Sequence, residues 1–184
     1  LLLALAIYGA LLWSAFDALE PQRAEAKTPA QDVLRRHGWI MMAIIALEIA
    51  GGGFVAGLHG GLVYNNFPMM GEHWIAPDLF SRSPWWSNFF ENPVAAQFLH
   101  RLLAGFVAIA LISLVVRARR AGLPRDLKRR FYYLPFGLLG QAALGIATLM
   151  LAVPLPLAVA HQAGAFILFA LGLYALHGMR RVQV

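Results

Sequence analysis

Five apolar runs, each long enough to cross a lipid bilayer, constrain this chain more than any other feature. A membrane-spanning helix needs about 20 predominantly apolar residues. Hydrophobic residues make up 60% of the 184-residue chain and charged residues only 13%, which is unlike a soluble domain. The sequence therefore predicts an all-α integral membrane protein. The expected spans are roughly 1–19, 39–58, 93–116, 131–153 and 157–177.

The distribution of basic residues predicts which side of the membrane each connection faces. Of the 15 Lys and Arg residues, 13 lie in segments that share one side if the helices alternate: 20–36, 117–130 and the tail. The loop 59–92 carries only Arg82. By the positive-inside rule, the basic segments face the cytoplasm or matrix and the loop faces outward. The net charge of +6 is thus explained by the topology. Membrane lipid is the expected partner, and no nucleic-acid partner is expected.

Two local patterns refine the expected topology. The loop 59–92 is rich in aromatic residues, and its WWSNFF stretch is expected to lie along the membrane interface. Asn92 is a predicted N-cap, followed by Pro93 at the first helical position. The chain opens inside an apolar run, so we expect Leu1 to be an internal position of a longer protein rather than the start of a signal peptide.

A short repeat relates two pairs of helices. In each pair, one helix carries a polar residue with glycine four positions later, and the next carries a histidine with alanine four positions later. The first pair has Glu48, Gly52, His100 and Ala104, and the second has Gln141, Gly145, His161 and Ala165. The pattern predicts two related helical hairpins. The glycines at 53, 57 and 61 also predict close approach of a neighbouring helix backbone.

The two histidines are expected at similar depth near the outer face. His100 lies about 10 Å into its predicted helix and His161 about 6 Å into its own. Two imidazoles above small residues suit the axial ligation of one haem iron from both sides. Two other interpretations stay open. In the first, each histidine is only a hydrogen-bonding group between helices. In the second, the pair belongs to a zinc site; zinc prefers about four ligands, and the nearby histidines left to complete the set are His59 and His73 on the loop.

Arg101 follows His100 directly and is the only cation predicted within a span. Its planar guanidinium is suited to pairing with a haem propionate. The alternative is that the side chain extends to the outer interface.

Three segments resemble the C-terminal half of the haem A synthase family. They are GGGFVAGLHGGLVYNNFPMMGEHWIAP, NFFENPVAAQFLHRLLAG and GQAALGIATLMLAVPLPLAVAHQAGAF, in that order between residues 51 and 166. The first helix resembles the family's fourth transmembrane helix. The resemblance implies a four-helix transmembrane bundle plus one preceding helix, which are helices four to eight of a pseudo-symmetric eight-helix protein.

The family resemblance also implies an oxidoreductase activity and its site. Haem A synthase oxidises a ring methyl group of haem O to the formyl group of haem A, for cytochrome oxidase assembly. Its C-terminal bundle holds a b-type haem between two histidines, which correspond to His100 and His161. Substrate haem O is handled in the N-terminal bundle, so the catalytic residues are not expected in this chain. The implied partners are haem O synthase, oxidase assembly factors and an electron donor.

The resemblance also sets the expected domains and location. Residues 1–19 would be a remnant of the N-terminal bundle, 20–38 a cytoplasmic-side linker, and 39–184 the haem b-binding bundle with its outer loop 59–92. The expected location is a bacterial or mitochondrial inner membrane, with the haem near the outer face. Two residues depart from the family: His59 replaces an acidic residue, and Glu48 stands in mid-membrane where glutamine is usual.

Two other functions remain open from the sequence alone. A stand-alone membrane cytochrome b would carry electrons from a quinol to a partner. A repeat-built transporter subunit would explain the repeat but not the two outer histidines. A homo-oligomer is compatible with any of these functions.

Overall fold

The computed structural model describes residues 1–20 and 28–180, and these residues form an all-helical protein without strands. The long helices are α1 (Leu2–Leu19), α2 (Pro29–Gly57), α4 (Pro93–Arg120), α5 (Arg125–Met150) and α6 (Leu155–His177). All five are long and apolar enough to cross a membrane. The predicted class, an all-α integral membrane protein, is confirmed.

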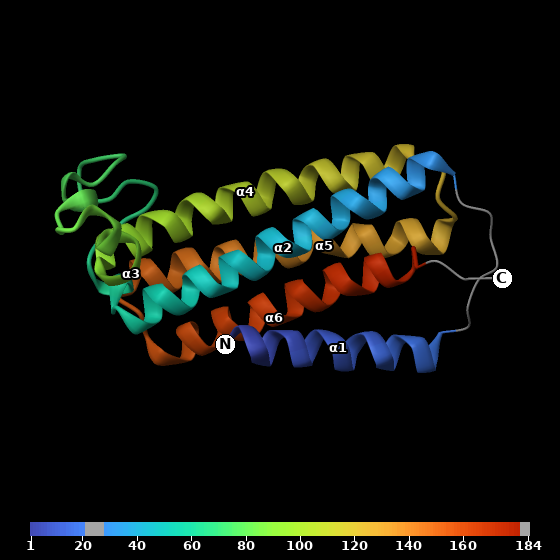
Figure 1. Cartoon of the computed structure of the whole chain (residues 1–184), viewed down its shortest axis with the longest axis horizontal. Helices are drawn as coiled ribbons and strands as arrows, with labels where there is room; N and C mark the ends of the chain where they lie inside the picture. Colours follow the sequence, from blue (N-terminus) through green and yellow to red (C-terminus); the bar gives the residue numbers. More distant parts are fainter. Residues whose placement is uncertain (21–27, 181–184) are drawn as a thin grey trace.

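The long helices lie side by side as a bundle of two hairpins with α1 outside it (Figure 1). The first hairpin is α2 packed along α4, and the second is α5 packed along α6. Contacts of α4 with α5 and of α2 with α6 join the two hairpins. α1 packs mainly against α6. The predicted four-helix bundle with one preceding helix is therefore the observed arrangement.

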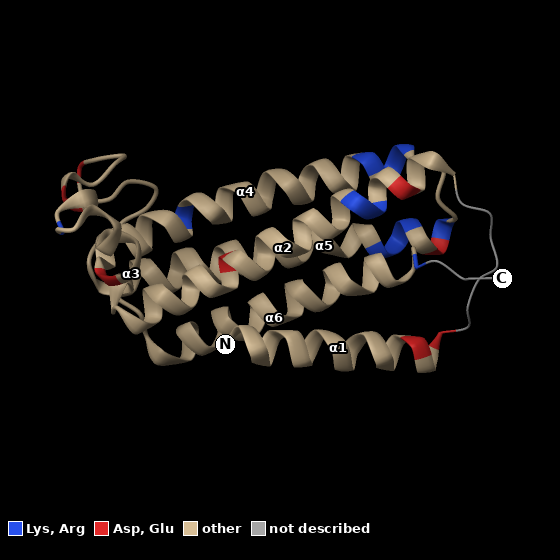
Figure 2. Ribbon diagram, in the orientation of Figure 1, with Lys and Arg blue, Asp and Glu red and all other residues tan. Residues whose placement is uncertain are grey.

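The two ends of the bundle differ in chemistry. The loop end carries residues 58–92, which contain η1 (Gly60–Leu62), η2 (Pro77–Phe80), η3 (Trp85–Ser87) and the short helix α3 (Asn88–Glu91). The opposite end gathers most of the positive charge (Figure 2), and we call it the basic end. Its described cations are Arg35, Arg36, Arg117, Arg119, Arg120, Arg125, Lys128, Arg129, Arg130 and Arg180. Arg23, Lys27 and Arg181 lie outside the described residues.

Helix α2 begins ten residues before the predicted span, so residues 29–38 of the expected linker are helical. Thr28 and Gln31 form a capping box, and Pro29 occupies the first helical turn, which together start the helix in a charged stretch. At α4 the predicted cap is confirmed, because the Asn92 side chain accepts hydrogen bonds from the backbone N–H groups of Val94 and Ala95.

The two hairpins meet where side chains of one helix occupy glycine positions of the other. The Met42 sulfur of α2 lies 2.5 Å from where a Cβ on Gly172 of α6 would be. The Leu176 side chain of α6 packs on Gly38 of α2 in the same way. Both glycines therefore leave room for a side chain of the facing helix.

The predicted backbone approach at the glycines 53, 57 and 61 is wrong. A Cβ on Gly57 would meet nothing within 4 Å, and those on Gly53 and Gly61 would meet side chains of Leu1 and Val153. The neighbours at these three positions are thus side chains or open space rather than backbone.

A polar cluster at the basic end attaches α1 to the bundle. His177 of α6 is fully buried, and its Nε2 lies 2.8 Å from Oδ1 of Asp17 on α1. Arg130 of α5 pairs with Glu20, just past α1, at 2.8 Å. Arg180 adds an ion pair with Asp17 at 3.3 Å. We call these five residues the α1 clamp.

Candidate functional site

The structure brings His100 and His161 together, although 61 positions separate them in the sequence. Their ring centroids are 6.4 Å apart and the ring planes are inclined by 80°. His100 lies seven residues after the start of α4 and His161 six residues after the start of α6. The rings are thus at nearly the same depth below the loop end, and more closely matched than the sequence predicted, because α6 begins at Leu155.

Each imidazole packs against a glycine of its own hairpin. A Cβ on Gly52 of α2 would lie 3.2 Å from Cε1 of His100. A Cβ on Gly145 of α5 would lie 2.7 Å from Cε1 of His161. Any larger residue at either position would displace the ring. The repeated glycines therefore have a structural reason: each makes room for one histidine.

The polar residues of the repeat contact their histidines differently. On α2, Oε1 of Glu48 lies 3.0 Å from Nδ1 of His100, at hydrogen-bond distance but without hydrogen-bond alignment. On α5, Nε2 of Gln141 donates to the backbone carbonyl of His161 at 3.0 Å. Nδ1 of His161 is buried and has no hydrogen-bond partner in the described part of the chain. Only the first hairpin therefore presents a carboxylate to its imidazole.

Arg101 points from α4 into the loop end. Its two terminal nitrogens donate to the carbonyls of Pro68 and Met69, and to those of Tyr64 and Asn66, at 2.9–3.2 Å. Its buried Nε has no partner within residues 1–20 and 28–180. Arg101 thus holds the loop against the helix that carries His100, and one of its donors remains unused.

The small residues below the histidines differ in their surroundings. Ala104 is exposed, whereas Ala165 is partly buried against the main core. The space next to the histidine pair is thus more open along α4 than along α6.

His59 and His73 lie on the loop and not beside the histidine pair. His59 is exposed, has a positive φ of 53° and precedes η1. His73 is exposed and forms an isolated bridge with Met70. In the described ranges, no group of three or more His, Cys, Asp or Glu side chains is arranged to hold a bare metal ion.

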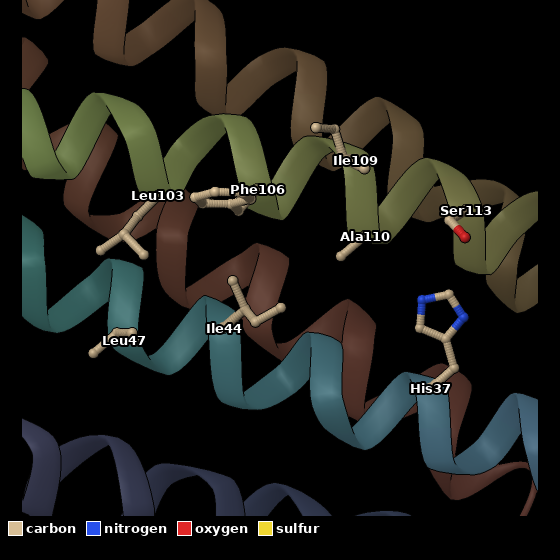
Figure 3. Close-up of a pocket in the computed structure, with 8 residues that line it drawn as sticks. All are labelled: His37, Ile44, Leu47, Leu103, Phe106, Ile109, Ala110 and Ser113. Carbon is tan, nitrogen blue, oxygen red and sulfur yellow. The ribbon is translucent and has the colours of Figure 1, made fainter.

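An apolar groove of about 340 Å³ opens between α2 and α4 (Figure 3). It starts one turn beyond His100, at Leu103, and continues toward the basic end. His37 of α2 and Ser113 of α4 are the polar groups at that end of the groove. The groove is next to the histidine pair but does not include it.

Two features of the structure, one at the site and one at the basic end, were not predicted from the sequence. The approach of Glu48 to His100 has a sequence signal, the repeated polar residue four positions before glycine, but the equivalent Gln141 contacts backbone instead. The α1 clamp was also missed, although Asp17 and His177 are polar residues in apolar helices, which is the signal that would have indicated it.

Comparison with known proteins places the chain in a family. A family model described as cytochrome oxidase assembly protein matches residues 1–173. A heme A synthase of Nitrosospira multiformis is 41% identical over 97% of this chain and 50% of its own length. Heme A synthase COX15 of Mus musculus is 42% identical over 97% of this chain and 43% of its own length.

A third relative, a heme A synthase of Rhodospirillum centenum, is 40% identical over 97% of this chain and 47% of its own length. The chain therefore spans about half the length of the curated relatives it matches. No solved structure matches it significantly. The similarity extends over the histidine pair and all five membrane helices, so the chain belongs to the haem A synthase family of cytochrome oxidase assembly proteins.

Proposed function

We propose that this chain is the C-terminal, haem b-binding half of a haem A synthase. His100 and His161 would be the axial ligands of the haem iron. The observation that carries this proposal is the distance of 6.4 Å between the two ring centroids at matched depth.

The residues present fit a haem by two criteria. With a metal–nitrogen bond of about 2 Å and a ring centroid about 1 Å behind that nitrogen, two imidazoles on opposite sides of one iron have centroids about 6 Å apart. The buried Nδ1 of His161 has no hydrogen-bond partner among the described residues. Both observations argue against the histidines serving only as hydrogen-bonding groups between helices.

This chain would contribute binding and positioning. His100 and His161 would each supply a neutral imidazole nitrogen, and Gly52 and Gly145 leave room for the rings. Arg101, next to His100, would offer its free Nε–H to a propionate while holding the loop. A bound b-type haem supplies one-electron redox chemistry, with a potential set by its ligands and burial.

The activity proposed for the whole protein is the oxidation of the haem O methyl group to the formyl group of haem A. Because the chain spans about half of its relatives, we assign that oxidation to a second bundle. Residues 1–19 would then be the last helix of that bundle, and 39–184 the haem b bundle. Haem O synthase, oxidase assembly factors and an electron donor would be partners, and the loop end would face the outside of an inner membrane.

The alternative of a stand-alone cytochrome b is not favoured by the comparisons, since the relatives described above are proteins named heme A synthase. The haem A synthase and the stand-alone cytochrome b can be distinguished in a host that makes haem O but no haem A, by extracting and identifying its haems. We expect haem A when the chain is co-expressed with the N-terminal half of a relative, and none when either half is expressed alone. Unchanged haem O in the co-expressing cells would contradict the synthase proposal.

The ligands are tested by the absorption spectrum of the purified chain. The reduced chain should be low-spin. His100→Ala and His161→Ala should each lose the haem, or leave it high-spin and able to bind carbon monoxide. His59→Ala and His73→Ala are matched controls and should keep the original spectrum. Low-spin haem retained in His161→Ala but lost in His59→Ala would show that the pairing is wrong.

A further inference from the structure

Glu48 is the one carboxylate in the interior of the membrane helices that the structure describes. The other acidic residues of the long helices, Asp17, Asp32 and Asp126, lie in end turns, and α4 and α6 contain none. Acidic side chains in mid-membrane are costly and usually have a functional partner. Among the described residues, Oε1 of Glu48 lies 3.0 Å from Nδ1 of the His100 imidazole.

Glu48 contacts the ring nitrogen of His100 that would not bind the iron, so it would act on the iron through His100. Glu48 faces Nδ1 of His100, which leaves Nε2 for an iron. The side chain of Glu48 is only 16% exposed, and its Oε2 has no hydrogen-bond partner among the described residues. A carboxylate that accepts a hydrogen bond from a ligating histidine fixes the orientation of the ring and makes the ligand more basic.

The second hairpin lacks this arrangement. Gln141 uses its amide to bind the carbonyl of His161, so Nδ1 of His161 has no such acceptor in the described chain. The two sides of the pair therefore differ in the group beside the imidazole, a carboxyl group at His100 and none at His161, although the repeat gives them the same packing. A more basic ligand on one side favours the more positively charged state of the metal, which is ferric over ferrous iron.

We propose that Glu48 is a positioning residue that lowers the reduction potential of the haem through His100. The proposal rests on the proposed function, since it requires a haem between His100 and His161. Partners of this kind typically change metal affinity by 10- to 100-fold, roughly, when they are removed. A tenfold loss of the preference for ferric iron corresponds to about 59 mV in a one-electron couple.

The test is a redox titration of the purified, haem-loaded chain, followed by absorbance. Glu48→Gln keeps the shape and removes the charge, and we expect its potential to rise by about 59 mV, the equivalent of that tenfold change. Glu48→Asp keeps a carboxylate and should recover at least half of the shift. Glu91→Gln is the matched control, because it makes the same chemical change at an exposed position on α3, 62% accessible, and should leave the potential unchanged.

Each outcome decides the proposal. An unchanged potential in Glu48→Gln with haem retained overturns it while leaving the proposed function intact. An equal rise in Glu48→Asp and Glu48→Gln also overturns it, because a carboxylate kept at position 48 would then have no effect on the potential. Loss of haem from Glu48→Gln but not from Glu48→Asp supports the positioning role. Loss of haem from both variants overturns the proposal that Glu48 sets the reduction potential. A wild-type chain that binds no haem refutes the proposed function itself.

Discussion

Replacing Gly145 with alanine is expected to weaken haem binding by pushing on one imidazole. The added methyl group would lie 2.7 Å from Cε1 of His161 and 3.3 Å from both ring nitrogens. Carbon atoms in contact settle at about 3.5–4.0 Å, so the ring or the helix must move by about 1 Å. Overpacking of this kind costs about 1–3 kcal/mol.

The higher helix propensity of alanine, worth about 0.5–1 kcal/mol, stabilises the haem-free and the haem-bound protein alike, so it leaves the haem affinity unchanged. A cost of about 1.4 kcal/mol to the ligating ring corresponds to a tenfold loss of haem affinity. Gly52→Ala should have a smaller effect, since its methyl group would lie 3.2 Å from His100. Gly140→Ala is the control on α5, because a Cβ there would meet nothing within 4 Å.

The assay is titration of the apoprotein in detergent with haemin, followed at the Soret band, together with unfolding of the haem-free protein. Affinity should fall in the order Gly140→Ala, Gly52→Ala, Gly145→Ala. Gly140→Ala should bind haem as the wild type does and gain about 0.5–1 kcal/mol in stability. Equal affinity of Gly145→Ala and Gly140→Ala would refute the reasoning, because the close contact with His161 would then have no effect on the ligand.

Three further outcomes follow from the fold. Single cysteines at Ser81 and Ala121 should react with impermeant reagents from opposite sides of the membrane, and labelling from one side would contradict the topology. Arg101→Lys cannot bind four carbonyls at once, so amide exchange in the loop it holds should accelerate about tenfold, measured by mass spectrometry, while the rest of α4 is unchanged. His177→Ala should lower the free energy of unfolding by about 1–3 kcal/mol in detergent, because it removes a buried partner of Asp17, which is itself 44% exposed. An unchanged stability would mean that the α1 clamp does not hold α1.

The architecture was predictable from the sequence because lipid imposes simple rules on it. Span length and hydropathy predicted all five long helices, and Asn92 followed by Pro93 predicted the start of α4. The start of α2 was missed because residues 29–38 include charged side chains, and a search for apolar runs stops at charged residues. The local signal was present in Thr28 and Gln31, whose capping box starts a helix regardless of hydropathy.

The pairing of the histidines was predictable, but the contacts around them were not. Depth and the repeat indicated that His100 and His161 would lie at the same level, and they lie 6.4 Å apart. The repeat could not predict that Glu48 turns to a ring and Gln141 to a carbonyl, because side-chain rotation depends on neighbours that the repeat does not contain. The carbonyls that receive Arg101 are likewise brought together by the fold of the loop and not by their spacing.

The glycine contacts between the hairpins have a mechanical consequence for the histidine pair. Each imidazole rests on its own hairpin, so the distance between the rings is fixed by the register of one hairpin against the other. That register is held nearer the basic end, where Met42 packs on Gly172 and Leu176 on Gly38. These contacts lie nearer the basic end than the histidines do, so a tilt of one hairpin against the other at this level would change the gap between the rings by a larger amount.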